Sequence, residues 1–355
     1  MLLFTSGTTG EPKAAILGHE NLTSYVLSTV EFAGSDDDEA AVVSVPPYHI
    51  AGASAILSSI FSGRRIVYLE SFEPAAWVDA MTTERVTHAM VVPTMLTRIL
   101  DELEARGATL PDLRALSYGG GPMPLPVIER ALQMLPHVNF VNAYGLTETA
   151  STIAILGPDD HRLAFGSDDP AIRRRLTSVG RPLPTVELSI RDPLGVPVHA
   201  NDRGEVWVRG TQVSGRYQGR DAGDDDGWFA TRDSGEFDTD GYLYLHGRLD
   251  DVIVRGGENL SPGEIEAVLA EHPSVESCAV VGVPDAEWGE RVVAAVVLRC
   301  GTSATQDELR NLVRDRLRST KTPELIDFRD ELPINETGKL LRRVLRDELT
   351  PSTSH

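Results

Sequence analysis

Over the first 190 residues, short apolar runs alternate with segments of helical periodicity. The runs 41–45 and 88–92 are rich in Val and Ala, as buried strands are, whereas 126–135 repeats its apolar residues along one helical face. This alternation predicts crossover α/β structure with a parallel sheet. Three segments follow strand-like runs: Pro-Pro at 46–47, Gly-Gly-Gly at 119–121 and Asn-Ala-Tyr-Gly at 142–145. Loops in this position form the ligand crevice of an open α/β sheet.

The pattern changes twice further along the chain. Residues 186–247 are rich in strand-like runs, with a hairpin predicted at Asp240-Gly241. Beyond residue 250, two capping boxes, Ser261 with Glu264 and Thr305 with Glu308, predict helix starts around two further strands. We therefore expect an α/β fold: a large N-terminal α/β domain with a β-rich subdomain, 1–249, and a small, mobile C-terminal α+β domain, 250–355.

Composition narrows the possible functions. With 355 residues, 41% of them hydrophobic, the chain has material for two cores. A formal charge of −20 argues against a nucleic-acid or anionic-membrane surface, because both require a cationic footprint. No run approaches a membrane span, and the start has no signal-type core. Cys278 and Cys300 form neither a metal spacing nor a disulfide framework, so we expect a cytoplasmic protein.

Lysine is rare in this chain: only three of its 33 basic residues are lysines. One of them, Lys13, closes the turn 5–13, which combines two glycines with three threonines and a serine. Such a turn lets the backbone approach an anion and surrounds it with donors, as a phosphate site requires. It is not a Walker A loop, because Lys13 follows Pro12 and precedes Ala14. An ordinary surface turn is the alternative.

Further segments could complete a nucleotide site. The turn 144–149 brings an aromatic ring, Tyr144, close to a carboxylate, Glu148, so the ring could stack on a base and the carboxylate could bind Mg²⁺. Asp233 could accept hydrogen bonds from ribose hydroxyls, with Arg248 adding a contact. Taken singly, Asp233 could equally be part of an acidic turn and Arg248 part of a surface ion pair.

Taken together and in this order, these segments resemble the adenylate-forming superfamily of acyl-CoA synthetases, carrier-loading adenylation domains and luciferases. The matching runs are 5–13, 46–52, 144–148, 204–210, Asp233, 247–266 and 333–339. The resemblance implies a large ATP-binding domain, a swivelling C-terminal domain and two half-reactions that use ATP, Mg²⁺ and coenzyme A.

Residue roles follow from the resemblance alone. The residues implied to bind ATP are Thr5, Ser6, Gly7, Thr8, Thr9, Gly10, Lys13, Gly119, Gly120, Gly121, Asn142, Ala143, Tyr144, Gly145, Asp233 and Arg248. Within this set the opening loop and Lys13 would hold the β- and γ-phosphates, residues 119–121 and 142–144 would frame adenine, and Asp233 would bind the ribose. Thr8 and Glu148 would hold Mg²⁺, and Thr147 would contact the α-phosphate.

A second lysine, Lys339, is the implied catalytic residue, together with Thr147 and Glu148. A carboxylate attacks an anionic phosphate poorly, so positive charge must bridge the two partners as negative charge builds on the phosphoryl oxygens. Asp250 corresponds to the hinge about which the small domain would rotate, and Gly256-Gly257 would then line the CoA channel. A simple helix-start turn is the alternative for Gly338-Lys339.

The chain departs from the family pattern in two places. Family members carry an N-terminal subdomain before the phosphate loop, whereas here Met1 stands in the strand that leads into it, so apolar surface should be exposed. A misannotated start, a natural fragment and half of a split enzyme all stay open. Arg232 stands where the family usually has glycine, and its side chain could crowd the ribose or contact a phosphate.

The acyl pocket is implied to include His49 and Ile50, and its glycine and aliphatic residues suit a fatty or aromatic acid. We therefore expect an ATP-dependent carboxylic acid:CoA ligase, an acyl-CoA synthetase, with a small carboxylic acid and CoA as partners and neither nucleic acid nor a membrane span. The alternatives are transfer to a carrier-protein thiol and a catalytically weak nucleotide-binding fragment that pairs with a separate N-terminal half.

Overall fold

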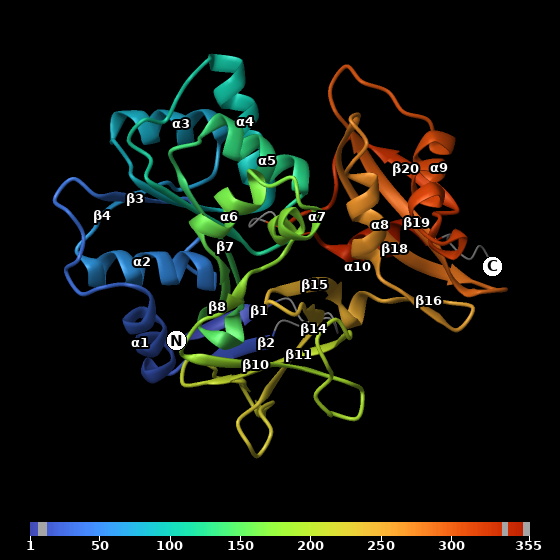
Figure 1. Cartoon of the computed structure of the whole chain (residues 1–355), viewed down its shortest axis with the longest axis horizontal. Helices are drawn as coiled ribbons and strands as arrows, with labels where there is room; N and C mark the ends of the chain where they lie inside the picture. The colour runs from blue at the N-terminus through green and yellow to red at the C-terminus, as the bar shows by residue number, and fades with distance from the viewer. Residues whose placement is uncertain (6–12, 336–339, 351–355) are drawn as a thin grey trace. The chain divides into compact units, whose positions relative to one another are not determined.

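The computed structural model describes residues 1–5, 13–335 and 340–350 (Figure 1). The chain divides into two compact units. The first comprises Met1–Thr231 with Gly235–Leu245, and the second comprises Arg232–Ser234 with His246–His355. The boundary expected at 249/250 stays a prediction, and each unit is described by itself below.

A seven-stranded sheet organises the first unit, in the order β4-β3-β5-β6-β7-β8-β9. Its strands are β3 (Ala40–Val43), β4 (Arg65–Tyr68), β5 (His88–Val91), β6 (Ala115–Gly119), β7 (Asn139–Leu146), β8 (Ser151–Leu156) and β9 (Arg181–Pro182). The first five strands in this order run parallel, whereas β8 and β9 are antiparallel additions. The carboxyl ends of β3, β5, β6 and β7 therefore open at one edge, and the predicted α/β fold class is confirmed.

Helices cover both faces of this sheet. In Figure 1, α3 (Pro74–Thr83), α4 (Pro93–Arg106) and α5 (Leu125–Met134) lie above it and α2 (Ile50–Ser62) lies below. Proline in the first turn starts α3 and α4, where no backbone donor is lost. Gly107, with a φ of +57°, ends α4 because glycine adopts this conformation without strain. The core contains fully buried Trp77, Leu96 and Phe140.

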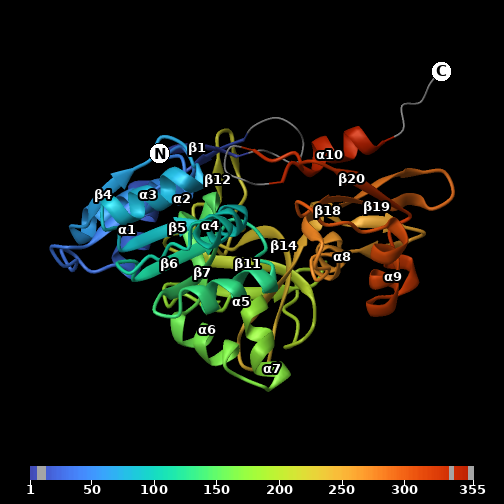
Figure 2. The same ribbon diagram turned by 90° about the horizontal axis from the view of Figure 1, so that it is seen from above.

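Around this sheet lie the remaining helices of the first unit, α1 (His19–Thr29), α6 (Pro158–Phe165) and α7 (Pro170–Arg173). Figure 2 shows α6 and α7 on the side of the unit away from α1. Between α6 and the sheet, the His161 ring is fully buried, and its Nε2 accepts a bond from the Tyr118 hydroxyl at 2.8 Å. Its Nδ1 donates to the Gly157 carbonyl at 2.7 Å. Burial lowers the pKa of His161 to about 4, so the ring is neutral near pH 7.

Two four-stranded sheets contain the remaining strands up to Arg248. One has the order β1-β2-β12-β13, with β1 (Leu2–Thr5), β2 (Lys13–Ile16), β12 (Arg216–Tyr217) and β13 (Arg220–Asp221). The other joins β10 (Val186–Arg191), β11 (Gly204–Gly210), β14 (Phe229–Phe237) and β15 (Leu243–Arg248). The hairpin predicted at Asp240-Gly241 is confirmed: Gly241 has a φ of +81°, and Asp238 accepts bonds from the Asp240 and Tyr242 amides.

The second unit is a five-stranded sheet with helices on both faces. Its strands are β16 (Ile253–Arg255), β17 (Glu258–Leu260), β18 (Val275–Asp285), β19 (Gly289–Leu298) and β20 (Leu325–Arg329). Side chains of α8 (Pro262–Leu269) and α9 (Gln306–Arg316) form one core against this sheet. Leu345 of α10 (Arg342–Leu349) belongs to a second core, formed with alternate residues of β18 and β19. Both faces of β18 are therefore buried.

One of the two predicted capping boxes is confirmed. Thr305 Oγ1 accepts from the Glu308 amide at 3.2 Å, and Glu308 accepts from the Thr305 amide at 2.7 Å. The other prediction was wrong in its bonding, although α8 does begin after Ser261. The Ser261 hydroxyl instead donates to the His246 carbonyl, and Glu264 pairs with the Lys321 ammonium. Because the Ser261 hydroxyl is engaged with that carbonyl, it does not cap the first turn of α8.

Candidate active site

A short turn after β7 holds Glu148. This turn, η1 (Thr147–Thr149), buries Glu148 to 7% exposure. The Tyr217 hydroxyl donates to Glu148 Oε1 at 2.6 Å, a length typical of a bond to an ionised acceptor. Thr149 is fully buried, and its hydroxyl bonds within the turn to the Leu146 amide and the Ser151 carbonyl. The turn is therefore rigid, and its carboxylate is held by a specific donor.

The same tyrosine connects Glu148 to the phosphate-loop region. Tyr217 pairs with Ala15 of β2, and the Gln218 amide donates to the Ala14 carbonyl at 2.9 Å. Lys13 begins β2 and pairs in register with Thr5 of β1. The structure thus brings Glu148 close to the strand that ends the loop. The predicted loop residues Ser6, Gly7, Thr8, Thr9 and Gly10 lie outside the described residues.

Sequence reasoning missed Tyr217. It lies in a two-residue strand, 216–217, which has no detectable period. An aromatic residue 69 positions from its carboxylate partner gives no local signal. Pairing with β2 fixes this tyrosine beside Glu148, and only the fold reveals that pairing.

The three glycines after β6 differ in what the structure demands of them. A Cβ on Gly119 would lie 2.2 Å from the Ala143 carbonyl oxygen, so close strand pairing requires glycine there. Gly120 has a φ of +82°, which favours glycine for conformational reasons. Neither reason applies to Gly121, whose Cβ would first meet Pro93 at 4.0 Å. Gly121 therefore leaves open space at the carboxyl ends of the strands.

The segment 142–145 is shaped by its own packing. The Asn142 side-chain amide donates to the Ser178 carbonyl at 3.0 Å. Tyr144 packs partly buried against the cores beneath β10 and β11. Gly145 passes so close to β8 that a Cβ would lie 1.8 Å from the Ser151 carbonyl oxygen. Ala143 pairs with Gly119 in register, so both predicted adenine segments lie side by side.

The predicted acyl-pocket residues lie at the start of α2, after β3. His49 is the N-cap of α2, and its ring lies 4.9 Å from the Tyr48 ring. Ile50 packs against the small cluster that contains Ala150, next to the Glu148 turn. The Ser151 and Ser54 hydroxyls bond at 3.2 Å, which ties α2 to the beginning of β8. His49 and Ile50 are thereby placed on the Glu148 side of the sheet.

The two predicted ribose residues come together at the start of the second unit. Asp233 is 8% exposed, and its Oδ1 lies 3.3 Å from Arg248 Nη1. The neighbouring Arg232 forms an ion pair with the predicted hinge residue Asp250, with 2.8 Å between Nη2 and Oδ1.

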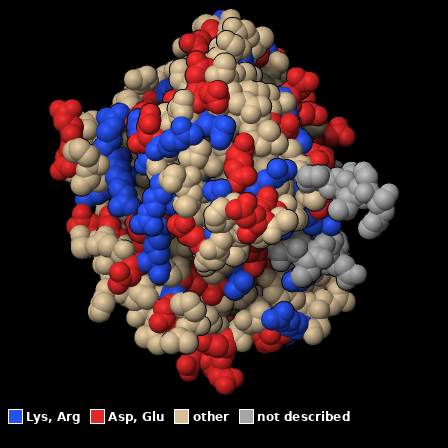
Figure 3. Space-filling model, turned by 90° about the vertical axis from the view of Figure 1, so that its right-hand side faces the viewer, with Lys and Arg blue, Asp and Glu red and all other residues tan. Residues whose placement is uncertain are grey.

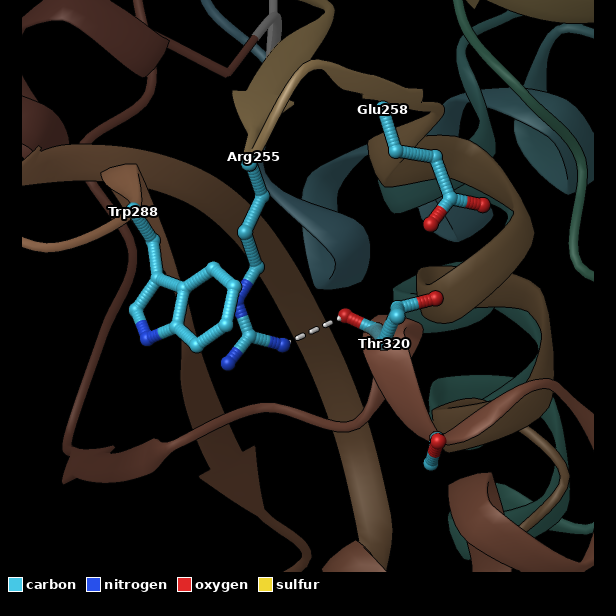
Figure 4. A pocket seen from close by; sticks show the side chains of 6 residues that line it. Arg255, Glu258, Trp288 and Thr320 are labelled. Atoms are coloured by element: carbon cyan, nitrogen blue, oxygen red, sulfur yellow. Dashed lines mark hydrogen bonds between the residues drawn. The ribbon is translucent and has the colours of Figure 1, made fainter.

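An open pocket adjoins the predicted CoA-channel glycines. Gly256 and Gly257 have φ values of +57° and +82°, and a Cβ on Gly256 would lie 2.9 Å from the Trp288 ring. Figure 4 shows Arg255 between Trp288 and Thr320, with its guanidinium donating to the Thr320 carbonyl at 2.8 Å. The pocket has a volume of about 290 Å³ and is lined by Arg255, Gly256, Glu258, Trp288, Ser319 and Thr320. No sequence pattern indicated Trp288, which is 31 residues beyond Gly257.

The predicted catalytic Lys339 lies outside the described residues. The nearby Arg342, three positions further along the chain, is described and is held by several partners. Arg342 of α10 donates to both Glu266 oxygens, at 2.6 and 2.8 Å, and to the Val280 carbonyl at 2.7 Å. Arg342 Nε also lies 3.2 Å from Asp251 Oδ2, beside the predicted hinge. The remaining lysine, Lys321, has a structural partner in Glu264.

Other chemistry is limited among the described residues. They contain no group of three or more His, Cys, Asp and Glu that could hold a metal, and no helix suited by length and apolarity to cross a bilayer. A buried carboxylate such as Glu148 does suit Mg²⁺, which prefers oxygen ligands and takes few from the protein.

Burial raises the pKa of the Cys278 thiol, which is not a reactive nucleophile. Acidic and basic side chains are interspersed over the face in Figure 3.

Comparison with known proteins identifies the family. The family model for AMP-binding enzymes matches residues 1–218, and that for the AMP-binding enzyme C-terminal domain matches residues 264–339. A feruloyl-CoA synthase from Amycolatopsis sp is 36% identical over 98% of this chain and 69% of its own length.

Two solved structures extend the comparison. The amide bond synthetase McbA from Marinactinospora thermotolerans is 34% identical, with a TM-score of 0.86 over 98% of this chain and 69% of its own. The o-succinylbenzoate CoA synthetase from Bacillus subtilis, in complex with ATP and magnesium ion, is 32% identical with a TM-score of 0.81, over the same shares. The resemblance read from the motifs is thus confirmed, and the chain belongs to the AMP-binding enzymes of the adenylate-forming superfamily.

Proposed function

We infer that this protein is an acyl-CoA synthetase: an ATP-dependent carboxylic acid:CoA ligase that forms an acyl-AMP intermediate and uses ATP, Mg²⁺ and CoA. The observation that carries this inference is the Tyr217 bond to Glu148. It fixes a buried carboxylate beside β2, at the end of the loop that would hold the phosphates. Glu148, with Thr8, is the proposed ligand of the magnesium ion, which would neutralise phosphate charge.

In the first half-reaction, a carboxylate oxygen of the acid attacks the α-phosphorus of ATP. The new bond makes acyl-AMP, and the α–β phosphoanhydride bond breaks to release pyrophosphate. We assign Lys339 and Thr147 to the α-phosphate, where negative charge develops, and Lys13 to the β- and γ-phosphates. Asp233 would accept bonds from the ribose hydroxyls, with Arg248 at 3.3 Å holding its carboxylate in place.

In the second half-reaction, the CoA thiol loses its proton, and the sulfur attacks the acyl carbon. The acyl–oxygen bond breaks, and AMP leaves with the electron pair. We propose that the pantetheine arm passes Gly256-Gly257, because both glycines are exposed and a Cβ on Gly257 would meet nothing within 4 Å. The adjacent pocket supports this proposal, since Trp288 offers a ring on which adenine could stack.

For the acid, we propose an aryl or fatty carboxylate, with the aryl class preferred. Two relatives, the feruloyl-CoA synthase and the o-succinylbenzoate CoA synthetase, are named for aromatic acids. The proposed pocket begins at His49 and Ile50 and extends toward the open space beside Gly121. A panel of aryl and fatty acids, assayed for CoA thioester by mass spectrometry, tests this class.

We also propose that a further polypeptide segment covers part of the first unit. The chain spans 69% of the length of the feruloyl-CoA synthase. Phe4 on β1 is 65% exposed, and Phe32, which follows α1, is 73% exposed. Leu2, Leu27 and Ile60, on β1, α1 and α2, are also more than half exposed. The occupant would be an N-terminal subdomain, in the same chain or in a separate one. A cytoplasmic location remains a further prediction.

The decisive experiment supplies the purified protein with ATP, Mg²⁺, an acid panel and three acceptors in parallel: CoA, a carrier protein bearing pantetheine, and a small amine. Formation of CoA thioester with AMP supports the proposal. If product forms with the carrier protein alone, or with the amine alone, then that compound is the acceptor in place of CoA. ATP binding without product for any acid would leave the weak nucleotide-binding fragment as the better description.

A further inference from the structure

Two residues that closely follow Glu148 adopt a backbone conformation that side chains disfavour. Ala150 has a φ of +52° and Ser151 a φ of +107°, both in the region where a Cβ causes strain. Glycine would avoid the strain, but it would lose the buried methyl group of Ala150 and the bond from the Ser151 hydroxyl to Ser54. Strain next to a predicted metal ligand persists only where the surroundings hold the turn in place.

The side chain of Gln212 joins the backbone on either side of this strained pair. Its amide nitrogen donates to the Thr149 carbonyl at 3.0 Å and to the Thr152 carbonyl at 2.7 Å. Its oxygen accepts a bond from the Thr185 hydroxyl at 3.3 Å. Backbone carbonyls only accept, so the nitrogen must be the atom that faces them. Gln212 is fully buried, and water therefore cannot readily take over these bonds.

The chain that follows Gln212 contacts the same turn twice more. The Ser214 amide donates to the Glu148 carbonyl at 2.8 Å, and the Tyr217 hydroxyl donates to the Glu148 carboxylate at 2.6 Å. Glu148 is thus held in two ways by one segment, 212–217. Tyr217 holds its side chain, and Gln212 holds the backbone that directly follows it.

We propose that Gln212 is a positioning residue for acid activation: it holds the strained turn after Glu148 and thereby places the Glu148 carboxylate to meet the Mg²⁺ of MgATP. This inference rests on the proposed function, in which Glu148 is a magnesium ligand. Gln212 acts through the backbone of the turn. The alternative is a buried, hydrogen-bonded glutamine that contributes to stability alone.

The test compares two replacements with the wild-type chain. Gln212→Met keeps a similar length without hydrogen bonds, and Gln212→Asn keeps an amide on a side chain one methylene shorter. Thr87→Val is the matched control, because the buried Thr87 hydroxyl also bonds to backbone, at 3.0 Å from both the Ala40 amide and the Ala40 carbonyl oxygen. Thr87 precedes β5, at the end of the parallel strands opposite to the Glu148 turn.

Three quantities are measured. Calorimetry gives the affinity for ATP at a series of Mg²⁺ concentrations without acid, so that no turnover occurs. Mass spectrometry gives hydrogen exchange over residues 144–154. Pyrophosphate release gives the kinetics of adenylation, with Mg²⁺ and the carboxylic acid varied separately.

Gln212→Met should weaken the apparent affinity for Mg²⁺ by about tenfold, in ATP binding and in adenylation, at the lower end of the range for groups that orient a metal ligand. Hydrogen exchange over 144–154 should rise, and the KM for the acid at saturating Mg²⁺ should not change. Gln212→Asn should lie between Gln212→Met and the wild type, because a shorter side chain cannot keep both bonds at their present lengths. Thr87→Val should lower the urea midpoint, as Gln212→Met does, but should leave Mg²⁺ affinity and exchange over 144–154 unchanged.

Wild-type Mg²⁺ affinity in Gln212→Met overturns the proposal, and so does unchanged exchange over 144–154. An equal loss of Mg²⁺ affinity in Thr87→Val also overturns it, since the effect would then reflect stability alone. Absence of product from the wild type with every acid and acceptor would count against the proposed ligase function alone, because ATP binding and hydrogen exchange need no turnover.

Discussion

Replacing Tyr217 with phenylalanine should impair acid activation while leaving the fold intact. The change removes one hydroxyl, which donates to Glu148 at 2.6 Å, and retains the ring that packs against the core beneath β10 and β11. Glu148 is 7% exposed, so water cannot readily replace the lost donor. The carboxylate then loses its fixed position beside β2.

The magnitude follows from the type of bond. A hydrogen bond to a charged group contributes about 1.5–3 kcal/mol. If this bond acts through the position of Glu148 in the transition state, its loss lowers kcat/KM for adenylation by roughly 10- to 150-fold. This range is an upper bound, because a bound cation could hold part of the carboxylate in place.

The assay separates the half-reactions. Adenylation is followed by pyrophosphate release over a range of Mg²⁺ concentrations, and thioester formation is followed from supplied acyl-AMP and CoA. Tyr68→Phe is the matched control, because Tyr68 is 53% exposed at the sheet edge. We expect a loss confined to adenylation and relieved in part by high Mg²⁺. Wild-type adenylation in Tyr217→Phe, or an equal loss in both half-reactions, would refute the reasoning.

Three further predictions concern the two units. His161 has a pKa near 4 in the folded protein and near 6.5 when unfolded, so the unfolded chain binds the proton first as the pH falls. The contribution of His161 to stability should therefore decline by about 1.4 kcal/mol per pH unit between pH 6.5 and 4, and His161→Gln should make the urea midpoint depend less steeply on pH in that window. Part of the slope should remain, because burial also lowers the pKa of His88 to about 4. Parallel profiles for the wild type and His161→Gln would argue against the prediction. Arg342→Met leaves Glu266 without its main partner and should destabilise the second unit by about 3 kcal/mol in thermal or urea unfolding. Arg316→Met, at the exposed pair with Glu271, should cost less than about 1 kcal/mol. Similar losses in the two variants would remove the special role of Arg342. Gly120→Ala forces a residue with a Cβ into a φ of +82° and should lower stability by about 1 kcal/mol. Gly121→Ala should leave stability unchanged and weaken ATP or acid binding. A larger stability loss at Gly121 than at Gly120 would reverse this assignment of roles to the two glycines.

Local patterns were sufficient to predict much of the fold. The strand-rich region 186–247 and the hairpin at Asp240-Gly241 were predicted correctly, because strand composition and turn chemistry are encoded within a few residues. The Thr305 capping box was predicted for the same reason. The Ser261 box failed because the Ser261 hydroxyl donates to the His246 carbonyl, 15 residues earlier, and such a partner is set by tertiary packing.

The candidate site likewise contains residues that local patterns indicate and residues that only the fold reveals. Glu148, Asp233 and Arg248 were predicted from residue chemistry and family resemblance, and their roles stay predictions, although the structure pairs Asp233 with Arg248. Tyr217 and Trp288 were missed because each joins its site through strand pairing or a distant turn. The glycines predicted to contact the ligand also differ in why glycine stands there, since Gly119 is needed for close strand packing and Gly121 is not.

Acid-dependent exchange of labelled pyrophosphate into ATP tests the adenylation claim most directly. Wild-type protein should catalyse this exchange without CoA, for the same acids that later give thioester. Lys339→Ala should abolish the exchange while still forming thioester from supplied acyl-AMP, and Lys321→Ala, at the lysine paired with Glu264, should retain it. Exchange that survives in Lys339→Ala, or that is absent with every acid that yields thioester, would contradict the account.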